Sequence, residues 1–165
     1  MGKAYTILAL DLGTNMGWCL GEDSVIVASA VEVFGAKDAH PGHRFLKFQN
    51  WLLQFNGVNE IYYEDVPRYV SKNNARVYCG FLAVLQIYSL ATGTRLTCMK
   101  ANSVKKEFTG NGRAEKADMC EAALKLGWAN GEYGGSLNHD EADAIGIFYA
   151  IEKRRGNEVR FTPLN

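Results

Sequence analysis

Several signals are missing from this chain of 165 residues. There is no CxxC pair, which argues against a zinc site and a disulfide scaffold, and the four cysteines are expected to be reduced thiols. They are scattered along the chain, at Cys19, Cys79, Cys98 and Cys120. No stretch looks long and apolar enough to span a membrane, and the N-terminal residues run directly into a strand-like segment rather than a signal peptide. We therefore expect a cytoplasmic protein.

The chain also has no net charge at pH 7, because 18 lysines and arginines balance 18 acidic residues. This balance is a mild argument against a nucleic-acid partner, which favours positive charge. The charge is unevenly spread, however. Residues 95–116 hold six basic and only two acidic side chains, and smaller basic groups lie within 68–76 and 153–155. Such local patches can bind a polyanion although the total charge is zero.

No internal repeat, low-complexity tract or linker interrupts the chain. Its 47% apolar and 22% charged residues are ordinary values for a globular protein. The length suits one domain with a real core. We predict a single domain over residues 1–165.

The pattern of apolar residues predicts an α/β fold. Apolar and β-prone runs predict an antiparallel meander of three strands over 5–12, 16–20 and 25–34, and two further strands over 60–65 and 95–99. Helical spacing predicts helices over 45–55, 74–91, 103–108, 114–126 and 139–155. This order suggests a mixed five-stranded sheet flanked by helices.

Four acidic residues stand at the ends of these elements. Asp11 closes the first strand, Glu64 closes a later one, and Asp140 and Asp143 open the last helix. Carboxylates rarely end buried strands unless a cation lies between them. Because no Cys/His cluster accompanies them, hard cations such as Mg²⁺ or Mn²⁺ are the expected counter-charge. The set therefore indicates two-metal phosphodiester chemistry, with Asp11 as the bridging ligand and the metals about 4 Å apart.

Simpler interpretations exist for each acid taken alone. Asp140 lies in a first helical turn, where Asn138, Asp140 and Glu141 can act as capping groups that also suit the helix dipole. Asp11 alone would be a turn residue. His139 reads as a capping group or a supporting neighbour more than as a metal ligand, and Glu141 is expected to point away. The capping interpretation weakens because all four acids occur in one short domain.

Three blocks and one further segment of the chain resemble the RuvC-type Holliday junction resolvases of the RNase H-like superfamily. The blocks are residues 7–18 around Asp11, residues 61–64 ending in Glu64, and the D-x-x-D-A run that begins at Asp140. Residues 103–116 are similar to the family segment V-K-x-x-x-x-G-x-G-x-A-x-K, which generic RNase H-like nucleases lack. Together these cover nearly the whole chain.

The resemblance implies a homodimeric endonuclease of DNA recombination and repair that nicks four-way junctions in pairs. It would use two Mg²⁺ ions per site, with Mn²⁺ able to substitute. The family's catalytic acids correspond to Asp11, Glu64, Asp140 and Asp143, and two basic residues near the scissile phosphate correspond to Lys105 and Lys116. The helix over 74–91 is the candidate dimer interface. Further DNA contacts are expected from Arg68, Tyr69, Lys72, Arg76, Lys106, Gly110, Gly112 and Arg113.

The chain departs from the family pattern after Glu64. An aromatic residue that stacks on a base usually follows, and here Tyr69 or the guanidinium of Arg68 would take that role beside Pro67. This departure leaves the preferred branch open among four-way junctions, flaps and three-way branches. The looser fit and the compact chain suggest a phage-encoded or otherwise divergent member, acting in a bacterial or phage-infected cytoplasm.

Other functions fit the sequence less well. The run Asp11-Leu12-Gly13-Thr14 also resembles the phosphate-binding turn of actin-like ATPases and sugar kinases, but those need a second such turn and a longer chain. A branched-DNA-binding protein without catalysis would be expected to have a broken acid set. A related RNase H-like nuclease that acts on other branched DNA or on RNA–DNA hybrids is the remaining alternative.

Overall fold

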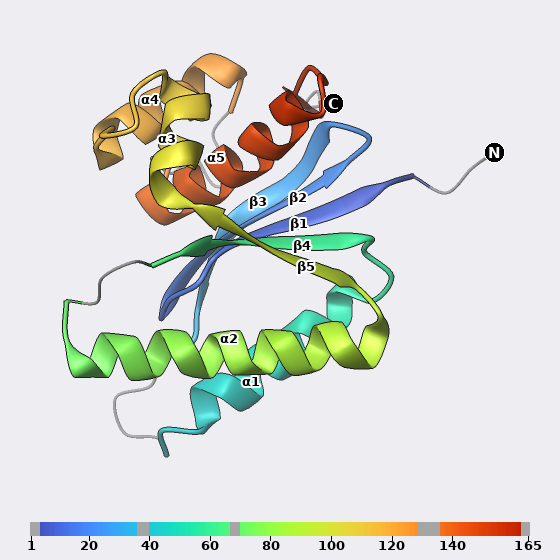
Figure 1. Cartoon of the computed structure of the whole chain (residues 1–165), viewed down its shortest axis with the longest axis vertical. Helices are drawn as coiled ribbons and strands as arrows, with labels where there is room; N and C mark the ends of the chain where they lie inside the picture. The colour runs from blue at the N-terminus through green and yellow to red at the C-terminus, as the bar shows by residue number, and fades with distance from the viewer. Residues whose placement is uncertain (1–3, 36–39, 67–69, 129–135, 163–165) are drawn as a thin grey trace.

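The computed structural model describes residues 4–35, 40–66, 70–128 and 136–162. They form a mixed six-stranded sheet with the strand order β5-β4-β1-β2-β3-β6 (Figure 1). The strands are β1 (Thr6–Asp11), β2 (Asn15–Glu22), β3 (Val25–Val33), β4 (Glu60–Asp65), β5 (Arg95–Lys100) and β6 (Arg160–Phe161). The first three are antiparallel neighbours, and β4 and β5 continue the sheet in parallel from β1.

The predicted α/β class, meander and flanking helices are confirmed, but the strand count was one too low. The missing strand is β6, which pairs in parallel with β3 through only two residues. Two residues are too few to show an alternating pattern, so periodicity could not reveal this strand.

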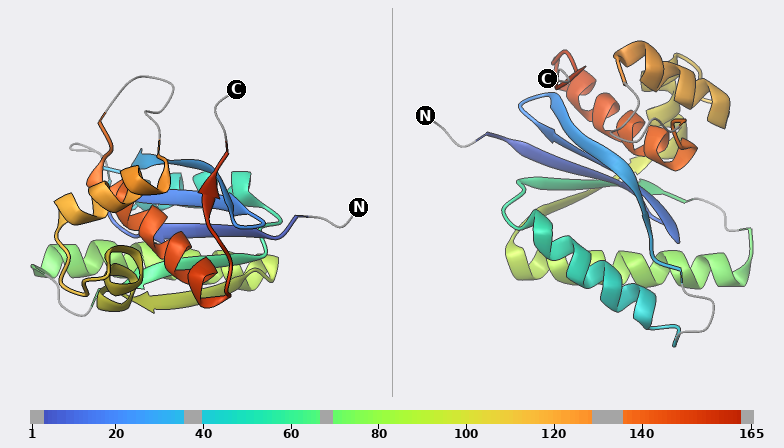
Figure 2. Two further views of the ribbon diagram at one scale, coloured as in Figure 1. Left: turned by 90° about the horizontal axis from the view of Figure 1, so that it is seen from above. Right: turned by 180° about the vertical axis from the view of Figure 1, so that it is seen from behind.

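Helices cover both faces of the sheet (Figure 2). One face carries α1 and α2, and the other carries α3, α4 and α5. The helices are α1 (His43–Leu52), followed by the 3₁₀ turn η1 (Leu53–Phe55), α2 (Lys72–Thr92), α3 (Ala101–Thr109), α4 (Lys116–Leu126) and α5 (His139–Arg154). The sheet therefore lies between two apolar layers.

Strand β1 is buried on both sides because its residues alternate between these layers. Ile7 and Ala9 belong to the core beneath α5, whereas Leu8 and Leu10 belong to the core beneath α1 and α2. All four are at most 2% exposed. A strand with two buried faces reads as a continuous apolar run rather than as an alternation. It delivers its last residue, Asp11, to an edge of the sheet between the two helical layers.

A glycine brings α5 against this edge. Gly17 pairs with Asp11 across β1 and β2. A Cβ atom at position 17 would lie 1.7 Å from the backbone oxygen of Asp140, a distance at which no atoms can coexist. The absence of a side chain at Gly17 therefore lets the first turn of α5 contact the sheet beside Asp11.

Helix α2 corrects one expectation from the sequence. By length and composition it passes as a membrane span, although no stretch was expected to do so. A buried core helix passes the same test, and α2 buries Phe81 and Leu85 completely, although only 22% of its apolar window is buried. One such helix is therefore weak evidence for a membrane.

Candidate active site

The four predicted acids lie at the same end of the structure. Strands β1 and β4 are parallel, and Leu10 pairs with Tyr63, so the next residues, Asp11 and Glu64, emerge at the same edge. The first two turns of α5 supply Asp140 and Asp143, and α5 packs against β1 and β2. Two strands and one helix that are far apart in the sequence thus bring their carboxylates to one place.

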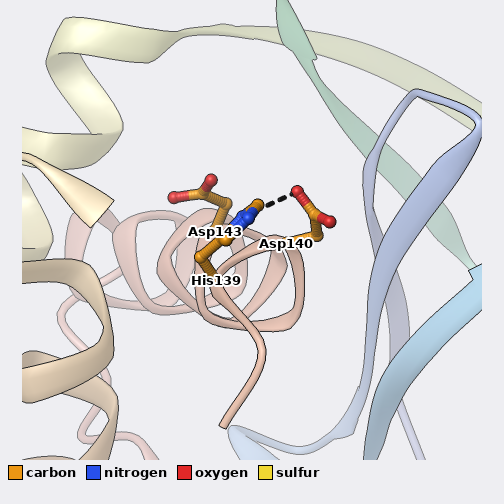
Figure 3. A group of neighbouring side chains, drawn as sticks. All are labelled: His139, Asp140 and Asp143. Carbon is orange, nitrogen blue, oxygen red and sulfur yellow. Dashed lines mark ion pairs between the residues drawn. The ribbon is translucent and has the colours of Figure 1, made fainter. Parts of the chain in front are cut away.

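Asp140 and Asp143 form a compact group with His139 (Figure 3). One possible ligand atom from each of the three side chains lies within 4.8 Å of the others. His139 Nδ1 is 2.9 Å from Asp140 Oδ1, the distance of an ion pair without the alignment of a hydrogen bond. Asp11 and Glu64 lie outside this tight group, but their charges interact with that of Asp143.

Burial and mutual repulsion raise the pKa values of Asp11, Glu64 and Asp143. Burial raises the pKa of Asp11 well above its ordinary value, and the charges of Asp143, Glu64 and Asp140 raise it further. Burial, followed by the charge of Asp143, raises the pKa of Glu64 to about 7. The pKa of Asp143 is also raised, mainly by burial, although Lys105 opposes the shift. The fold therefore holds these groups together against their electrostatic preference.

The donor set suits hard divalent cations. In the part of the chain that the structure describes, no lysine or arginine forms an ion pair with any of the four carboxylates. Closely placed carboxylate oxygens that lack a cationic partner are the ligands that Mg²⁺ and Mn²⁺ prefer. A divalent cation would also lower the raised pKa values by supplying the missing positive charge.

The capping interpretation of the α5 acids is resolved in favour of Asn138. Its side-chain oxygen accepts a hydrogen bond of 2.8 Å from the backbone N–H of Asp140. Glu141 points away from the group, as expected, and its Oε1 accepts hydrogen bonds from Ser29 Oγ at 2.7 Å and Trp128 Nε1 at 2.9 Å. The cap of α5 is therefore Asn138 rather than Asp140 or Asp143.

Two lysines and a histidine border the acids. Lys105 on α3 acts on the charges of Glu64 and Asp143, and Lys116 acts on those of Asp11 and Asp143. The Lys116 ammonium lies 3.1 Å from His139 Nε2. The sequence pattern marked both lysines, but it did not show that His139 would contact one of them.

The other predicted DNA-contact residues divide into three groups. Lys72 and Arg76 are exposed in the first two turns of α2, and Lys106 and Arg113 are exposed on and after α3. Gly110 ends α3 with a positive φ of 83°, as a left-handed cap. Gly112 lies close to α3, since a Cβ there would be 3.2 Å from the Asn102 oxygen. Arg68 and Tyr69 lie outside the described residues.

A cavity of about 430 Å³ adjoins the acids on the side of α3. Its walls include Lys105 and Gly112, two residues marked by the sequence motif, and Asp65, which follows Glu64. Lys100, at the end of β5, lines it as well. In the sequence, Lys100 is only one of the basic residues within 95–116. Its position next to Lys105 depends on the turn from β5 into α3.

Comparisons of sequence and of fold find similar known proteins. No protein-family model matches the chain. A curated relative, the crossover junction endodeoxyribonuclease RuvC of Ehrlichia canis (strain Jake), is 26% identical over 156 residues. The match covers 89% of this chain and 97% of the relative. It therefore extends over most of both chains rather than over an isolated segment.

Solved structures show the fold. RuvC of T. thermophilus in complex with a Holliday junction substrate matches with a TM-score of 0.75 and 17% identity, covering 92% of this chain and 96% of that one. The yeast mitochondrial Holliday junction resolvase Ydc2 matches with a TM-score of 0.65 and 15% identity, covering 87% of this chain and 76% of that one. In sequence and in fold, the chain is similar to the RuvC-type Holliday junction resolvases, and the resemblance that its motifs predicted is confirmed.

Proposed function

We propose that this protein is a divalent-metal-dependent endonuclease, a crossover junction endodeoxyribonuclease that resolves four-way DNA junctions by paired symmetric nicks. The observation that carries the proposal is a set of four carboxylates at the sheet edge of a RuvC-like fold, none of which forms an ion pair with a described lysine or arginine. Similarity to RuvC along nearly the whole chain supports the substrate class.

Asp11, Glu64, Asp140 and Asp143 would hold two Mg²⁺ ions, or Mn²⁺ in their place, with Asp11 as the bridging ligand. Ions bound there would supply Lewis-acid activation of a water and stabilisation of the leaving 3′-oxygen. The protein's part is to keep the carboxylates close together before binding. Glu64 with a pKa of about 7 must lose its proton when it becomes a ligand, so metal binding should weaken below neutral pH.

Lys105 and Lys116 would hold the scissile phosphate. Both lie beside the acids without a carboxylate ion pair among the described residues, so their positive charges are free to meet phosphate oxygens. A lysine in this place serves positioning and charge stabilisation. Lys116→Ala should therefore slow the chemical step more than it weakens junction binding.

The DNA would follow the basic surfaces on either side of the acids. The cavity next to Lys100 and Lys105 suits a backbone phosphate, and Lys106 and Arg113 extend this surface along α3 and the turn after it. Lys72 and Arg76 extend the surface along α2 on the other side. Base stacking by Tyr69 or Arg68 stays a prediction from the sequence.

Paired nicks require two active sites, and the outer face of α2 is our candidate for a homodimer interface. Leu90 is 87% exposed and Ile87 is 63% exposed on this face. A groove of about 180 Å³ lies between Ile87 of α2 and Leu53 of η1, which is also exposed. A twofold contact through this surface would present the two sites to opposite strands of a symmetric junction.

Sedimentation tests the interface with a matched pair of variants. Leu90→Glu should shift the protein from dimer to monomer at micromolar concentration. Leu124→Glu changes a leucine on a different helix, α4, that is 52% exposed, and it should leave the mass unchanged. A dimer that survives Leu90→Glu would place the interface elsewhere.

Cleavage of a labelled mobile four-way junction tests the activity. Linear duplex, a flap and an RNA–DNA hybrid serve as competing substrates, in Mg²⁺ and in EDTA. Symmetric nicks on the junction alone that disappear in EDTA would establish the proposal. Cutting of the flap or the hybrid would keep the metal site but assign a different RNase H-like activity, and cutting that persists in EDTA would contradict the metal mechanism.

A further inference from the structure

Glu141, in the first turn of α5 next to Asp140, is a buried acid that the proposed chemistry does not use. It is 9% exposed. Among the described residues, the two other buried glutamates, Glu60 and Glu152, pair with Arg155, whereas no lysine or arginine forms an ion pair with Glu141. An acid buried without a cation must be held by hydrogen bonds, so its donors indicate what it does.

Two donors from different elements meet at one oxygen of Glu141. Ser29 Oγ, on β3, donates to Oε1 at 2.7 Å, and the indole Nε1–H of Trp128 donates to the same oxygen at 2.9 Å. Trp128 directly follows Gly127, the left-handed cap that ends α4. One carboxyl oxygen therefore joins the sheet, the end of α4 and the start of α5. An amide oxygen could accept the same two hydrogen bonds, so the contact requires an acceptor and not a charge.

The first turn of α5 needs such a restraint because electrostatic repulsion pushes it away from the sheet. The charges of Asp140 and Asp143 on α5 repel that of Asp11 on β1. The bare backbone of Gly17 lets this turn come close to β2 and sets the closest approach. A steric contact of this kind cannot prevent the turn from moving outward. The hydrogen bonds of Glu141 act in that direction, since they tie the same turn to β3.

The far end of α5 carries a matched contact. Ser24, in the turn between β2 and β3, donates a hydrogen bond to Glu152 Oε2. Glu152 lies about 16 Å further along the helix than Glu141. Both contacts join a serine at or next to β3 to a glutamate of α5, but only one of them lies beside the acid cluster. The two serines can therefore separate the stability of α5 from the position of its acids.

We propose that Glu141 is a positioning residue for the acid cluster: its carboxyl oxygen, held by Ser29 and Trp128, fixes the first turn of α5 so that the acids of this helix face those of β1 and β4. The proposal rests on the proposed metal site and deepens it. In this role Glu141 acts through the helix turn rather than by touching metal or DNA.

Calorimetry of Mn²⁺ binding to the full chain tests the positioning role. Glu141→Ala removes the acceptor and should weaken binding about tenfold, in the range found for groups that support metal ligands. Trp128→Phe keeps the aromatic ring but loses the donor, and it should weaken binding by a smaller factor. Glu141→Gln should restore most of the affinity, because its amide oxygen can accept both hydrogen bonds. Unchanged affinity in Glu141→Ala, or binding by Glu141→Gln that is as weak as in Glu141→Ala, would overturn the proposal.

The two serines provide the matched control. Ser29→Ala and Ser24→Ala each remove one donor from a glutamate of α5, and they should lower the urea midpoint of unfolding by similar amounts. Only Ser29→Ala should also weaken Mn²⁺ binding. Equal weakening by Ser24→Ala would mean that metal affinity follows the overall stability of the helix, and it would overturn the positioning role.

A readout in the metal-free protein separates failure of this proposal from failure of the proposed function. The chain has three tryptophans, so the indole N–H signal of Trp128 can be assigned in NMR spectra by its loss in Trp128→Phe. This signal should shift in Glu141→Ala and stay near its wild-type position in Glu141→Gln. An indole signal that is unchanged in Glu141→Ala would overturn the proposal. A wild type with the expected indole shifts that binds no Mn²⁺ would instead contradict the proposed function.

Discussion

Strand β4 and helix α5 each carry carboxylates near both of their ends, and the two ends of the molecule differ in what neutralises them. Glu60 begins β4 and Glu64 lies about 13 Å further along the strand. Asp143 lies in the early part of α5, and Glu152 lies about 13 Å further along the helix. One pair, Glu60 and Glu152, meets a cation, whereas the other pair does not.

At the paired end, Arg155 joins both acids. It contacts Glu60 closely and lies 3.3 Å from Glu152, and both glutamates are at most 3% exposed. Burial alone would raise the pKa of Glu60, but hydrogen bonds from Tyr62, Tyr5 and Arg155 outweigh it and lower the pKa. This end is a satisfied structural network.

At the other end, burial and mutual repulsion raise the pKa values of Asp11, Glu64 and Asp143. Carboxylates are thus stabilised at one end of the molecule and are a source of electrostatic strain at the other. The difference shows that burial alone does not mark a carboxylate as functional. A buried carboxylate indicates a functional site when no positively charged side chain pairs with it.

The largest effect should come from removing one unpaired acid. Asp143→Asn replaces a proposed anionic metal ligand with a neutral amide, so junction cleavage should fall by at least about 100-fold, since even groups that only support metal ligands matter 10–100-fold. Junction affinity should persist. Glu121→Gln, an exposed acid paired with Lys125, is the control and should cut normally. Normal cutting by Asp143→Asn would remove this residue from the site.

Breaking the paired end should affect stability instead of chemistry. Arg155→Met leaves Glu60 and Glu152 buried without their shared cation, and it should lower the free energy of unfolding by about 3 kcal/mol. Arg154→Met, whose contact with Glu107 is 3.8 Å and largely exposed, should lower it by less than about 1 kcal/mol. Urea denaturation measures both. Equal losses would mean that the network at Arg155 is no more important than a surface pair.

The pH dependence of stability should have opposite signs at the two ends. The pKa of Glu64 is raised from 4.5 to about 7, so its stabilising contribution is complete below pH 4.5 and is lost as the pH rises through about 7. The loss in EDTA should be on the order of 2–3 kcal/mol. Glu60, with a lowered pKa, contributes stability above pH 4.5 and loses it in acid.

Glu64→Gln isolates the first of these contributions. Its free energy of unfolding, compared with wild type across pH 4 to 8 in EDTA, should show the wild type losing stability relative to the variant as the pH rises. A constant difference across this range would mean that Glu64 ionises normally in the folded protein.

The smallest effect should be the increase in stability that Mg²⁺ binding gives. Mg²⁺ at ten times its dissociation constant should stabilise the wild type by about 1.4 kcal/mol, a rise in melting temperature of a few degrees. Asp11→Asn should lose most of this gain, and Glu121→Gln should keep it. An equal shift in Asp11→Asn would mean that the ion binds elsewhere.

The sequence was most informative where local patterns determine structure. The apolar, β-prone run of β1 and the helical spacing around Phe81 and Leu85 predicted their elements, and the D-x-x-D run predicted that Asp140 and Asp143 share a helix face. The family motif added Lys105 and Lys116, which composition alone would have left as surface charge. These features depend on residues that are close in the chain.

What the sequence could not show depends on contacts between distant segments. Glu60 and Glu152 are 92 positions apart in the chain and meet only because Arg155 bridges the strand and the helix. The contact of Lys116 with His139 likewise needs α4 and α5 to be placed side by side. Residue type alone does not distinguish Glu60 from Glu64, and the sequence does not show which of them has a counter-charge, because the tertiary structure decides this.

Gly17 gives the active site a component that no screen for reactive groups would detect. It has no side chain, yet the overlap that a Cβ would make with the Asp140 backbone couples the spacing of β2 and α5 to the position of a carboxylate. Replacement by alanine would wedge the helix away from the strand and separate two of the proposed metal ligands without removing either. In a random mutagenesis survey we expect this position to be classed with the proposed catalytic acids, and restoring activity would need a shift of the whole helix rather than a new functional group.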